Sequence, residues 1–177
     1  MSKTKILLAL DPSSTCTGWA VFHQNARAGI KLHRYGRVKA SKRLSVPERV
    51  ESMVIDLGVV IMKESPDCAF IERPGKANYF NKQGQRTSSG TDTLYHAWAC
   101  IYAMLAEHLG LYNVYGVRPQ SWKGNGSKLA TIETVNLAYG LSLTLTENDM
   151  ADAVYMGGWF LERQKIDPIK PLVRCDL

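Results

Sequence analysis

The chain has 177 residues, which suits one domain with a full hydrophobic core and leaves little room for a second. Its hydrophobic fraction of 45% and charged fraction of 21% exclude a disordered protein and a long coiled coil. The formal charge of +6 favours a polyanionic partner such as nucleic acid, because cations that neutralise phosphates release counterions; a simple solubility surplus is the alternative.

The cysteines and the apolar runs bear on the compartment of the protein. Four cysteines lie far apart and form no Cys-x-x-Cys pair, so neither a zinc site nor a disulfide framework is expected. The apolar run at residues 6–10 is too short for a secretory signal, and no run is long enough to span a membrane. We therefore expect a cytoplasmic protein without a membrane partner.

The first part of the chain predicts three strands. Residues 6–10 form a continuous apolar run that ends at Asp11-Pro12, which is typical of a buried strand. A turn rich in serine and threonine follows, and residues 18–22 predict a returning strand that completes a hairpin. Residues 30–39 alternate apolar and polar side chains and predict a third strand. Strands this close in sequence most often pair antiparallel.

The remainder of the chain alternates helices and strands. Apolar residues at helical spacing predict a helix over residues 45–63, with Ser45 as its N-cap and Glu48 three residues later. A buried strand at 68–71, a helix at 91–109, a strand at 113–117 and helices at 127–140 and 148–164 follow. This order predicts an α/β fold with a mixed five-stranded sheet, its first three strands antiparallel, and helices on both faces. We expect residues 1–177 to form a single domain.

Four acidic residues occupy suggestive positions on this map. Asp11 and Glu72 each follow a buried strand, and their carboxylates would share one sheet edge if the two strands are parallel neighbours. Asp149 and Asp152 lie three residues apart at the start of the last helix, and therefore on one face of it. Each residue also has an ordinary explanation: a turn opener, a surface pair with Arg73, or an acid favoured by the helix dipole.

Taken together, these four carboxylates indicate a metal site. Four carboxylates at one point cannot all ionise without a counter-charge, and Mg²⁺ or Mn²⁺ is the oxygen-preferring cation that supplies it. Two such ions, about 3.5–4 Å apart, form the arrangement used for phosphodiester hydrolysis. This chemistry needs no protein nucleophile, in agreement with the lack of a convincing Ser/His/Asp or Cys/His set.

Several segments, in order from about residue 6 to residue 157, resemble the RuvC-type Holliday-junction resolvases. The segment Asp11-Pro-Ser-Ser-Thr-Cys-Thr-Gly18 is similar to the opening Asp-Pro-Gly segment and the following Thr-Gly pair of that family. Phe70-Ile-Glu72 resembles its second acidic strand, and Asp149-Met-Ala-Asp152-Ala resembles the start of its acidic helix. Pro119-Gln-Ser-Trp-Lys123 resembles a Pro-x-x-Val-Lys segment, and the stretch up to Lys128 resembles a Gly-x-Gly segment followed by lysine.

The resemblance implies an RNase H-like fold, a homodimer, Mg²⁺ and paired nicking of four-way DNA junctions. Carried over by position, it implies that Asp11, Glu72, Asp149 and Asp152 bind metal. It also implies that Lys123 or Lys128 contacts the scissile phosphate, and the residues leave open which of the two does so. Ser13 stands where the family usually has glycine, and the segment between the lysines is short, so we expect a divergent, phage- or plasmid-type member.

The segment that follows Glu72 predicts a DNA-binding loop over residues 73–90. It contains glycines, asparagines and a proline, no acid, and the cations Arg73, Lys76, Lys82 and Arg86. We expect these cations to contact phosphates, because the loop leaves the sheet beside Glu72. Tyr79 and Phe80 either stack on unpaired bases and wedge the junction, or Phe80 anchors the loop on the core.

Three other features have competing interpretations. A second basic run, Arg37, Lys39, Lys42 and Arg43, is interpreted as a solvated face. Trp122 either packs under the sheet, which we expect, or stacks on a sugar. The apolar stripe of the helix at 91–109 either pairs across a two-fold dimer or covers the sheet.

The expected activity is therefore Mg²⁺-dependent resolution of branched DNA. A nuclease with broader targets, such as flaps, forks or RNA–DNA hybrids, remains open. A non-catalytic junction-binding protein is less consistent with four intact acids, because like charges gathered without metal reduce stability. An actin-like phosphotransferase normally needs two such domains, and 177 residues are too few.

Overall fold

The computed structural model describes residues 4–74, 89–124 and 126–163. Within them, the strands are β1 (Lys5–Pro12), β2 (Cys16–Asn25), β3 (Gly29–Lys39), β4 (Cys68–Glu72) and β5 (Val114–Val117). The helices are α1 (Val46–Glu64), α2 (Ser89–Leu109), α3 (Pro119–Trp122), α4 (Lys128–Tyr139) and α5 (Asn148–Arg163). Two short 3-10 turns, η1 (Leu111–Asn113) and η2 (Leu145–Glu147), precede β5 and α5.

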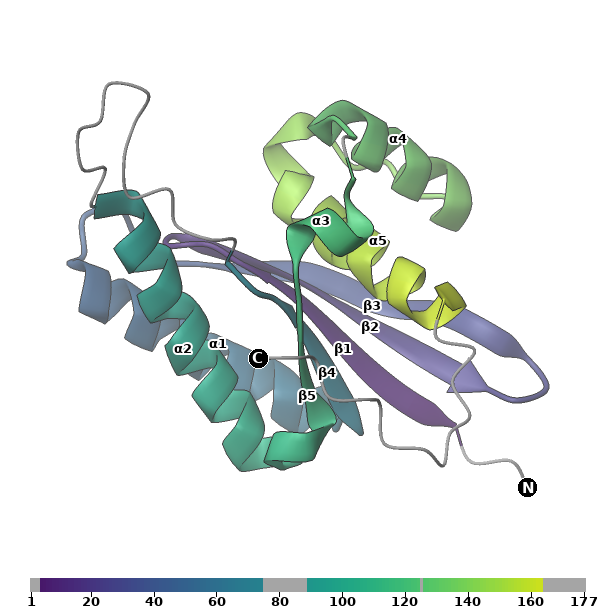
Figure 1. Cartoon of the computed structure of the whole chain (residues 1–177), viewed down its shortest axis with the longest axis horizontal. Helices are drawn as coiled ribbons and strands as arrows, with labels where there is room; N and C mark the ends of the chain where they lie inside the picture. The colour runs from purple at the N-terminus through teal and green to yellow at the C-terminus, as the bar shows by residue number, and fades with distance from the viewer. Residues whose placement is uncertain (1–3, 75–88, 125, 164–177) are drawn as a thin grey trace.

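The strands form one mixed sheet in the order β3-β2-β1-β4-β5 (Figure 1). β1 pairs antiparallel with β2 and parallel with β4, and β4 pairs parallel with β5. The predicted five-stranded mixed sheet with three antiparallel strands at its beginning is confirmed. β1 is central, so that residues at its carboxyl end have neighbours from both halves of the sheet.

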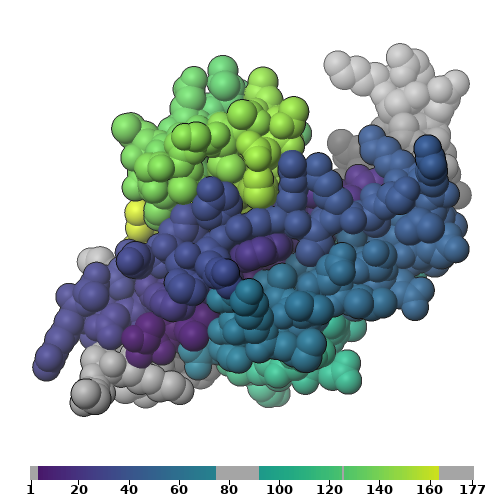
Figure 2. All heavy atoms as spheres, turned by 180° about the vertical axis from the view of Figure 1, so that it is seen from behind, coloured from purple at the N-terminus to yellow at the C-terminus, as the bar shows by residue number. Residues whose placement is uncertain are grey.

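Helices cover both faces of the sheet, and each face has its own apolar core. α5 and α4 cover one face, where Leu7 and Ala9 of β1 meet Val154 and Met156 of α5. α1 and α2 cover the other face, where Leu8 and Leu10 of β1 are buried. Figure 2 shows the two helical layers, with the green-to-yellow α4–α5 layer on one side of the sheet and the teal layer on the other. Alternation along β1 therefore assigns odd-numbered residues to the α5 face.

Helix ends follow the predicted signals closely. Ser45 caps α1, and its side chain and that of Glu48 form the reciprocal capping box. α4 begins after Ser127, whose hydroxyl accepts a hydrogen bond from the backbone N–H of Ala130, and ends at Gly140 in the left-handed conformation. α2 begins at Ser89, two residues before the predicted start, and α3 was not predicted.

The first hairpin extends further than the apolar runs indicated. Asp11 and Pro12 belong to β1, where they pair with Gly18 and Thr17 of β2, so the prediction that Asp11 follows the strand was wrong by two residues. Pairing continues because the connecting turn is short and held by hydrogen bonds: the backbone N–H of Ser13 donates to the carbonyl oxygen of Cys16. Asp11 is therefore fixed by the ladder of the sheet and not by a flexible turn.

The apolar stripe of α2 covers the sheet. Ala97, Ile101 and Leu105 are fully buried, and Ile101 and Leu105 belong to the core between α1, α2 and the sheet. The interpretation that the stripe covers the sheet is confirmed for these residues, and its pairing across a dimer stays a prediction. In the described part of the chain, no helix is sufficiently long and apolar to cross a membrane.

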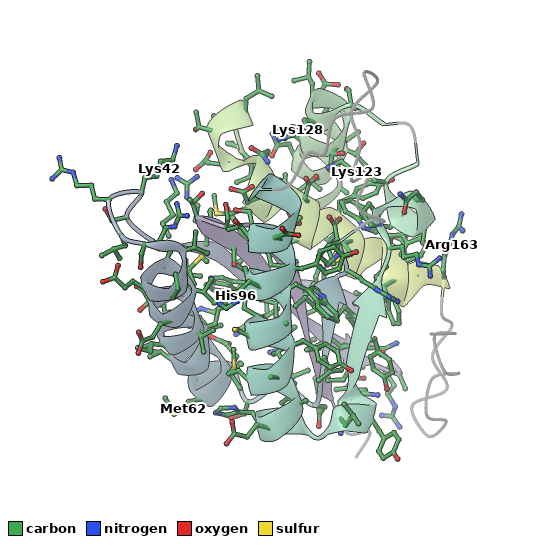
Figure 3. All side chains as sticks on the ribbon, turned by 60° about the vertical axis from the view of Figure 1, so that its left-hand side comes forward. Lys42, Met62, His96, Lys123, Lys128 and Arg163 are labelled. Atoms are coloured by element: carbon green, nitrogen blue, oxygen red, sulfur yellow. The ribbon has the colours of Figure 1, made fainter. Side chains whose placement is uncertain are left out.

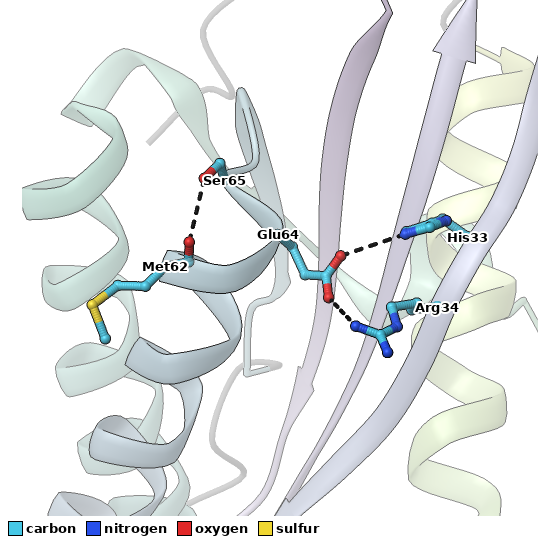
Figure 4. A network of polar contacts seen from close by, with 5 residues as sticks. All are labelled: His33, Arg34, Met62, Glu64 and Ser65. Carbon is cyan, nitrogen blue, oxygen red and sulfur yellow. Dashed lines mark hydrogen bonds and ion pairs between the residues drawn. The ribbon is translucent and has the colours of Figure 1, made fainter.

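The carboxyl end of α1 is tied to the outer strand β3 by a charged network (Figure 4). The Glu64 carboxylate accepts a 2.9 Å hydrogen bond from Arg34 and lies 3.7 Å from the Nε2 atom of His33. The Glu64 side chain is only 8% exposed, so a paired cation is required to keep its charge there. This network lies near the middle of β3 and fixes the carboxyl end of α1 against the sheet.

Candidate active site

Two of the predicted acids lie on neighbouring parallel strands. Leu10 of β1 pairs with Ile71 of β4, so Asp11 and Glu72, one residue further along, leave adjacent strands at the same edge. Both residues have the parity of the α5 face, since Ala9 and Phe70 belong to the core on that side. The sheet therefore directs the two carboxylates toward the start of α5, as the sequence predicted.

The other two acids lie in the first turns of α5, which begins directly over β2. Gly18 of β2 lies against the backbone of Asp149, and only a residue without a side chain permits this approach. Asp152, one turn later, is 5% exposed and is the only acidic residue among the buried polar residues of the described chain. Asn148 donates a hydrogen bond of 3.1 Å to Asp149 and holds its carboxylate at the helix start.

The four carboxylates form one electrostatic cluster. Burial raises the pKa of Asp11 well above its ordinary value, and the charges of Glu72, Asp152 and Asp149 raise it further. Lys123 opposes this effect. The structure thus brings together the side chains that the sequence separates by up to 141 positions, from residue 11 to residue 152.

Glu72 and Asp152 are perturbed in the same direction. Burial, followed by the charge of Asp152, raises the pKa of Glu72 to about 7, although Lys123 and the indole of Trp122 act in the opposite direction. Burial also raises the pKa of Asp152, and it outweighs the effect of Lys123, even though that lysine forms a direct ion pair with it. Burial therefore outweighs the opposing effect of the nearby lysines on both carboxylates.

Lys123 is the cation inside the cluster. It directly follows α3, and its ammonium group donates to Oδ2 of Asp152 at 2.5 Å, with 22% of the side chain exposed. The ring of Trp122 supports it, since the Lys123 nitrogen lies 5.2 Å from the ring centroid. Lys128, at the start of α4, is exposed and acts on Asp152 only through its charge. In Figure 3 the two lysines lie at the same end of the molecule.

Two neutral side chains contact the cluster from behind. Trp122 is 4% exposed and packs in the core, as predicted, near Tyr155. The indole nitrogen of Trp122 is buried and forms no hydrogen bond of regular geometry. It nevertheless lies close enough to the Glu72 carboxylate to lower the pKa of Glu72. On the other side, burial and a hydrogen bond with Asp149 raise the pKa of the Cys16 thiol to about 12, so this cysteine stays protonated.

Curated proteins with similar sequences carry the name crossover junction endodeoxyribonuclease RuvC. The protein from Synechocystis is 27% identical over 157 residues, which cover 83% of this chain and 85% of that protein. The protein from Chlamydia caviae is 27% identical over 84 residues, which cover 48% of each. No protein-family model matches the chain.

Solved structures extend the likeness to the whole fold. A Thermus thermophilus RuvC in complex with a Holliday junction superposes with a TM-score of 0.69 at 19% identity, covering 95% of this chain and 99% of that one. The yeast mitochondrial Holliday junction resolvase Ydc2 superposes with a TM-score of 0.63 at 13% identity, covering 93% and 81%.

The chain is similar in sequence to the RuvC resolvases and shares their fold.

This RuvC-like chain has the RNase H-like fold that the sequence resemblance implied. The low identities agree with the expected divergence.

The donor chemistry of the RuvC-like cluster fits a divalent cation that prefers oxygen ligands. Burial raises the pKa values of Asp11, Glu72 and Asp152, neighbouring carboxylates raise them further, and a cation of charge +2 would stabilise the ionised forms. Within residues 4–74, 89–124 and 126–163, however, no three His, Cys, Asp or Glu side chains already stand in position to bind one ion. Asp152 in particular is engaged by Lys123.

Most of the predicted DNA-binding loop lies outside the described residues. Lys76, Tyr79, Phe80, Lys82 and Arg86 fall in residues 75–88, so their predicted contacts with DNA stay predictions. Arg73 is described: its backbone N–H donates to the carbonyl oxygen of Val117 at 2.7 Å, and its side chain is half-buried. The loop therefore leaves the sheet between β4 and β5, next to Glu72.

Sequence reasoning missed the role of Trp122 and Cys16 as neighbours of the acids. The signal for Trp122 was its position directly before Lys123, where the RuvC segment that it resembles has valine. The signal for Cys16 was the hairpin register: pairing of Asp11 with Gly18 places Cys16 on the same face, two residues away. The signal for Cys16 is visible only when the register of the hairpin is known.

Proposed function

We propose that this chain is a metal-dependent endonuclease that cuts four-way DNA junctions. The proposal is supported by the relation to proteins named crossover junction endodeoxyribonuclease RuvC and by the net charge of +6, which favours a nucleic-acid partner. The observation that carries it is that Asp11 and Glu72 end neighbouring parallel strands on the face that α5 covers, where the charges of Glu72, Asp152 and Asp149 all raise the pKa of Asp11.

Asp11, Glu72, Asp149 and Asp152 would hold Mg²⁺, for which Mn²⁺ would substitute, as two ions in each site. Bound there, the ions would activate water for attack on a phosphodiester and stabilise the leaving oxygen. Asp11 is central to the set, because it interacts with all three other carboxylates. The sheet ladder holds Asp11 and Glu72 in place, whereas α5 carries Asp149 and Asp152 as one rigid unit.

Lys123 is better placed than Lys128 to act on the scissile phosphate. Its ammonium group already lies among the carboxylates, 2.5 Å from Asp152, and is held over the Trp122 ring. A cation that binds Asp152 would release Lys123, whose charge would then be available to a phosphate that gains negative charge in the transition state. Lys128 is exposed and would contact the DNA backbone further from the cut.

Cleavage of labelled synthetic DNA tests the proposal. Four-way, three-way, flap and linear substrates of one sequence are incubated with Mg²⁺, Mn²⁺ or EDTA. We expect symmetric nicks in the four-way junction, activity with either ion, and no product in EDTA. Asp11→Asn should abolish cutting while binding to the junction is kept or improved, because a ligand and a negative charge are removed.

Each alternative predicts another outcome of that experiment. Equal cutting of flaps, forks or RNA–DNA hybrids would favour a nuclease of broader specificity. Tight junction binding without cleavage under any metal would indicate a binding protein. Undiminished cutting by Asp11→Asn would count against the carboxylate site itself.

A homodimer is part of the proposal, because two coordinated cuts in a nearly two-fold symmetric junction need two sites. Light scattering of the free protein and of its junction complex tests it. A complex with one protein chain per junction that still makes paired cuts would contradict this part of the proposal only.

A further inference from the structure

The cations of the chain are unevenly distributed. Residues 12–47 contain no acidic residue and seven arginines or lysines, in a chain with 16 acids. Four of the seven lie at the end of β3 and in the turn before α1, and we call them the basic strip: Arg37, Lys39, Lys42 and Arg43. Composition alone favours a solvated face for such a run, so its position in the fold decides its role.

The register of the sheet places the basic strip beside the carboxylates. Arg37 pairs with Gly18, and Gly18 pairs on its other side with Asp11, so the three residues form one row across the sheet. Two strand spacings separate Arg37 from Asp11, about 10 Å. Val38 belongs to the core on the α1–α2 side, so Arg37 and Lys39 have the parity of the α5 face, which also carries the acids.

The backbone of the strip is fixed, and most of its charge is free. Arg37 donates a 2.6 Å hydrogen bond to the carbonyl oxygen of Thr146, just before α5. The next turn closes between Ser41 and Leu44 with a 3.1 Å backbone hydrogen bond. Lys39, Lys42 and Arg43 are exposed, and within the described chain none of the three forms an ion pair.

One acid faces the strip. Glu147, in the turn before α5, has a lowered pKa chiefly because Thr144 donates hydrogen bonds to it, with smaller contributions from Arg37 and Lys39. Glu147 is half-buried, and Lys39, Lys42 and Arg43 remain exposed outside any ion pair of the described chain. The strip therefore presents net positive charge beside the acidic cluster.

Cations lie on both sides of the carboxylates. Figure 3 shows Lys42 at the same end of the molecule as Lys123 and Lys128, with Met62 at the opposite end. The strip follows β3, at one edge of the sheet, whereas Lys123 and Lys128 follow β5, at the other edge. A polyanion that crosses the acids would meet positive charge before and after them.

We propose that the basic strip binds the phosphate backbone of DNA on the β3 side of the carboxylate cluster. The inference rests on the proposed function, since it names a second contact for the same substrate. About 10 Å corresponds to roughly three base-pair rises, so the strip would hold phosphates a few nucleotides from the cut. Such contacts fix the register of the DNA without reading its sequence.

Salt-dependent binding separates this role from a solvated face. The variant Lys39→Ala/Lys42→Ala/Arg43→Ala removes three charges of the strip and keeps Arg37, which ties β3 to the turn before α5. The control Arg27→Ala/Lys31→Ala/Lys63→Ala removes three exposed charges at the opposite end. Affinity for a four-way junction is measured in EDTA from 50 to 300 mM NaCl, and thermal melting verifies that both variants fold.

We expect the strip variant to flatten the slope of log K against log salt by about 0.9 for each lost contact, hence by up to about 2.7. The control variant should keep the wild-type slope. Equal slopes for both variants would overturn the proposal. A strip variant that binds the junction like the wild type and loses only the binding of an acidic protein partner would also overturn it. Cleavage by the wild type with Mg²⁺ is measured in parallel. Absence of cleavage would refute the proposed function, whereas the slope of log K against log salt would still show whether the basic strip binds DNA.

Discussion

A Cβ atom on Gly18 would lie 1.9 Å from the carbonyl oxygen of Asp149. The two backbones are therefore in direct contact where α5 begins over β2, and this contact delivers Asp149 to the carboxylate cluster. We expect Gly18→Ala to push the start of α5 away from the sheet, to lower the free energy of unfolding by about 1 to 3 kcal/mol and to remove most cleavage.

Gly58 supplies the matched control for that substitution. It lies in the middle of α1, and a Cβ there would meet nothing within 4 Å. Gly58→Ala should therefore stabilise the protein by about 0.5 to 1 kcal/mol and leave cleavage unchanged. Chemical denaturation of both variants, followed by junction cleavage, measures the contrast; equal stability of the two would show that the contact at Gly18 has no consequence.

Asp11→Asn should stabilise the protein in the absence of metal above neutral pH. The pKa of Asp11 is raised in the folded state, so between the unfolded and folded values the folded chain binds more protons, and stability falls as the pH rises through this range. Asparagine removes that loss. We expect a gain of about 1 kcal/mol or more at pH 8 in EDTA, roughly 2–4 °C in melting temperature, that shrinks toward pH 4.

Asp56→Asn, at an exposed position of α1, removes the same charge far from the cluster and serves as its control. Addition of Mg²⁺ should raise the melting temperature of the wild type and reverse the order of stability with Asp11→Asn. A variant that is less stable than wild type at pH 8 in EDTA would show that Asp11 experiences no net repulsion.

The affinity for Mg²⁺ should decrease as the pH falls below about 7. The pKa of Glu72 is raised to about 7, so its proton competes with the cation in this range. The Mg²⁺ concentration that gives half of the thermal stabilisation should rise up to about tenfold per pH unit between pH 7 and 5.5, and should level off above pH 8. Constant affinity over that range would mean that Glu72 does not bind the ion.

Substitutions of Lys123 and Lys128 should have different effects on cleavage and on DNA binding. Lys123→Met removes the ammonium group that lies 2.5 Å from Asp152, so cleavage should fall by about 10²–10³ while Mg²⁺ binds at least as tightly, because a competing charge is lost. Lys128→Met should lower cleavage by about tenfold or less and reduce the salt dependence of binding. Melting in Mg²⁺ verifies folding; equal rate losses in the two variants would contradict a special role for Lys123.

The sequence predicts the fold and the acid cluster well because both depend on local patterns. Buried strands are marked by apolar runs, helix ends by Ser45, Ser127 and Gly140, and the acids by their place directly after apolar runs or at a helix start. The meeting of Asp11 and Glu72 follows from one assumption, that β1 and β4 are parallel neighbours, and the sheet bears it out.

What the sequence does not predict depends on contacts between distant segments. The approach of Trp122 to Glu72 requires the four-residue helix α3, which is too short to leave a periodic pattern. The basic strip looks like any exposed run until the row from Arg37 through Gly18 to Asp11 is known. Charge runs can be found in a sequence, but their neighbours across a sheet cannot.

Because Asp149 and Asp152 lie on α5, the last described helix, the carboxylate cluster is completed late in the synthesis of the chain. A nascent chain that has emerged only as far as α4 contains Asp11 and Glu72 but lacks half of the cluster, and it also lacks the α5 side of the core. The repulsion that Asp149 and Asp152 exert on Asp11 thus arises only when α5 docks, together with the apolar contacts of α5 that offset it. A chain that ends before α5 therefore lacks two of the four acids that the proposed cleavage requires, and such a truncation should be inactive.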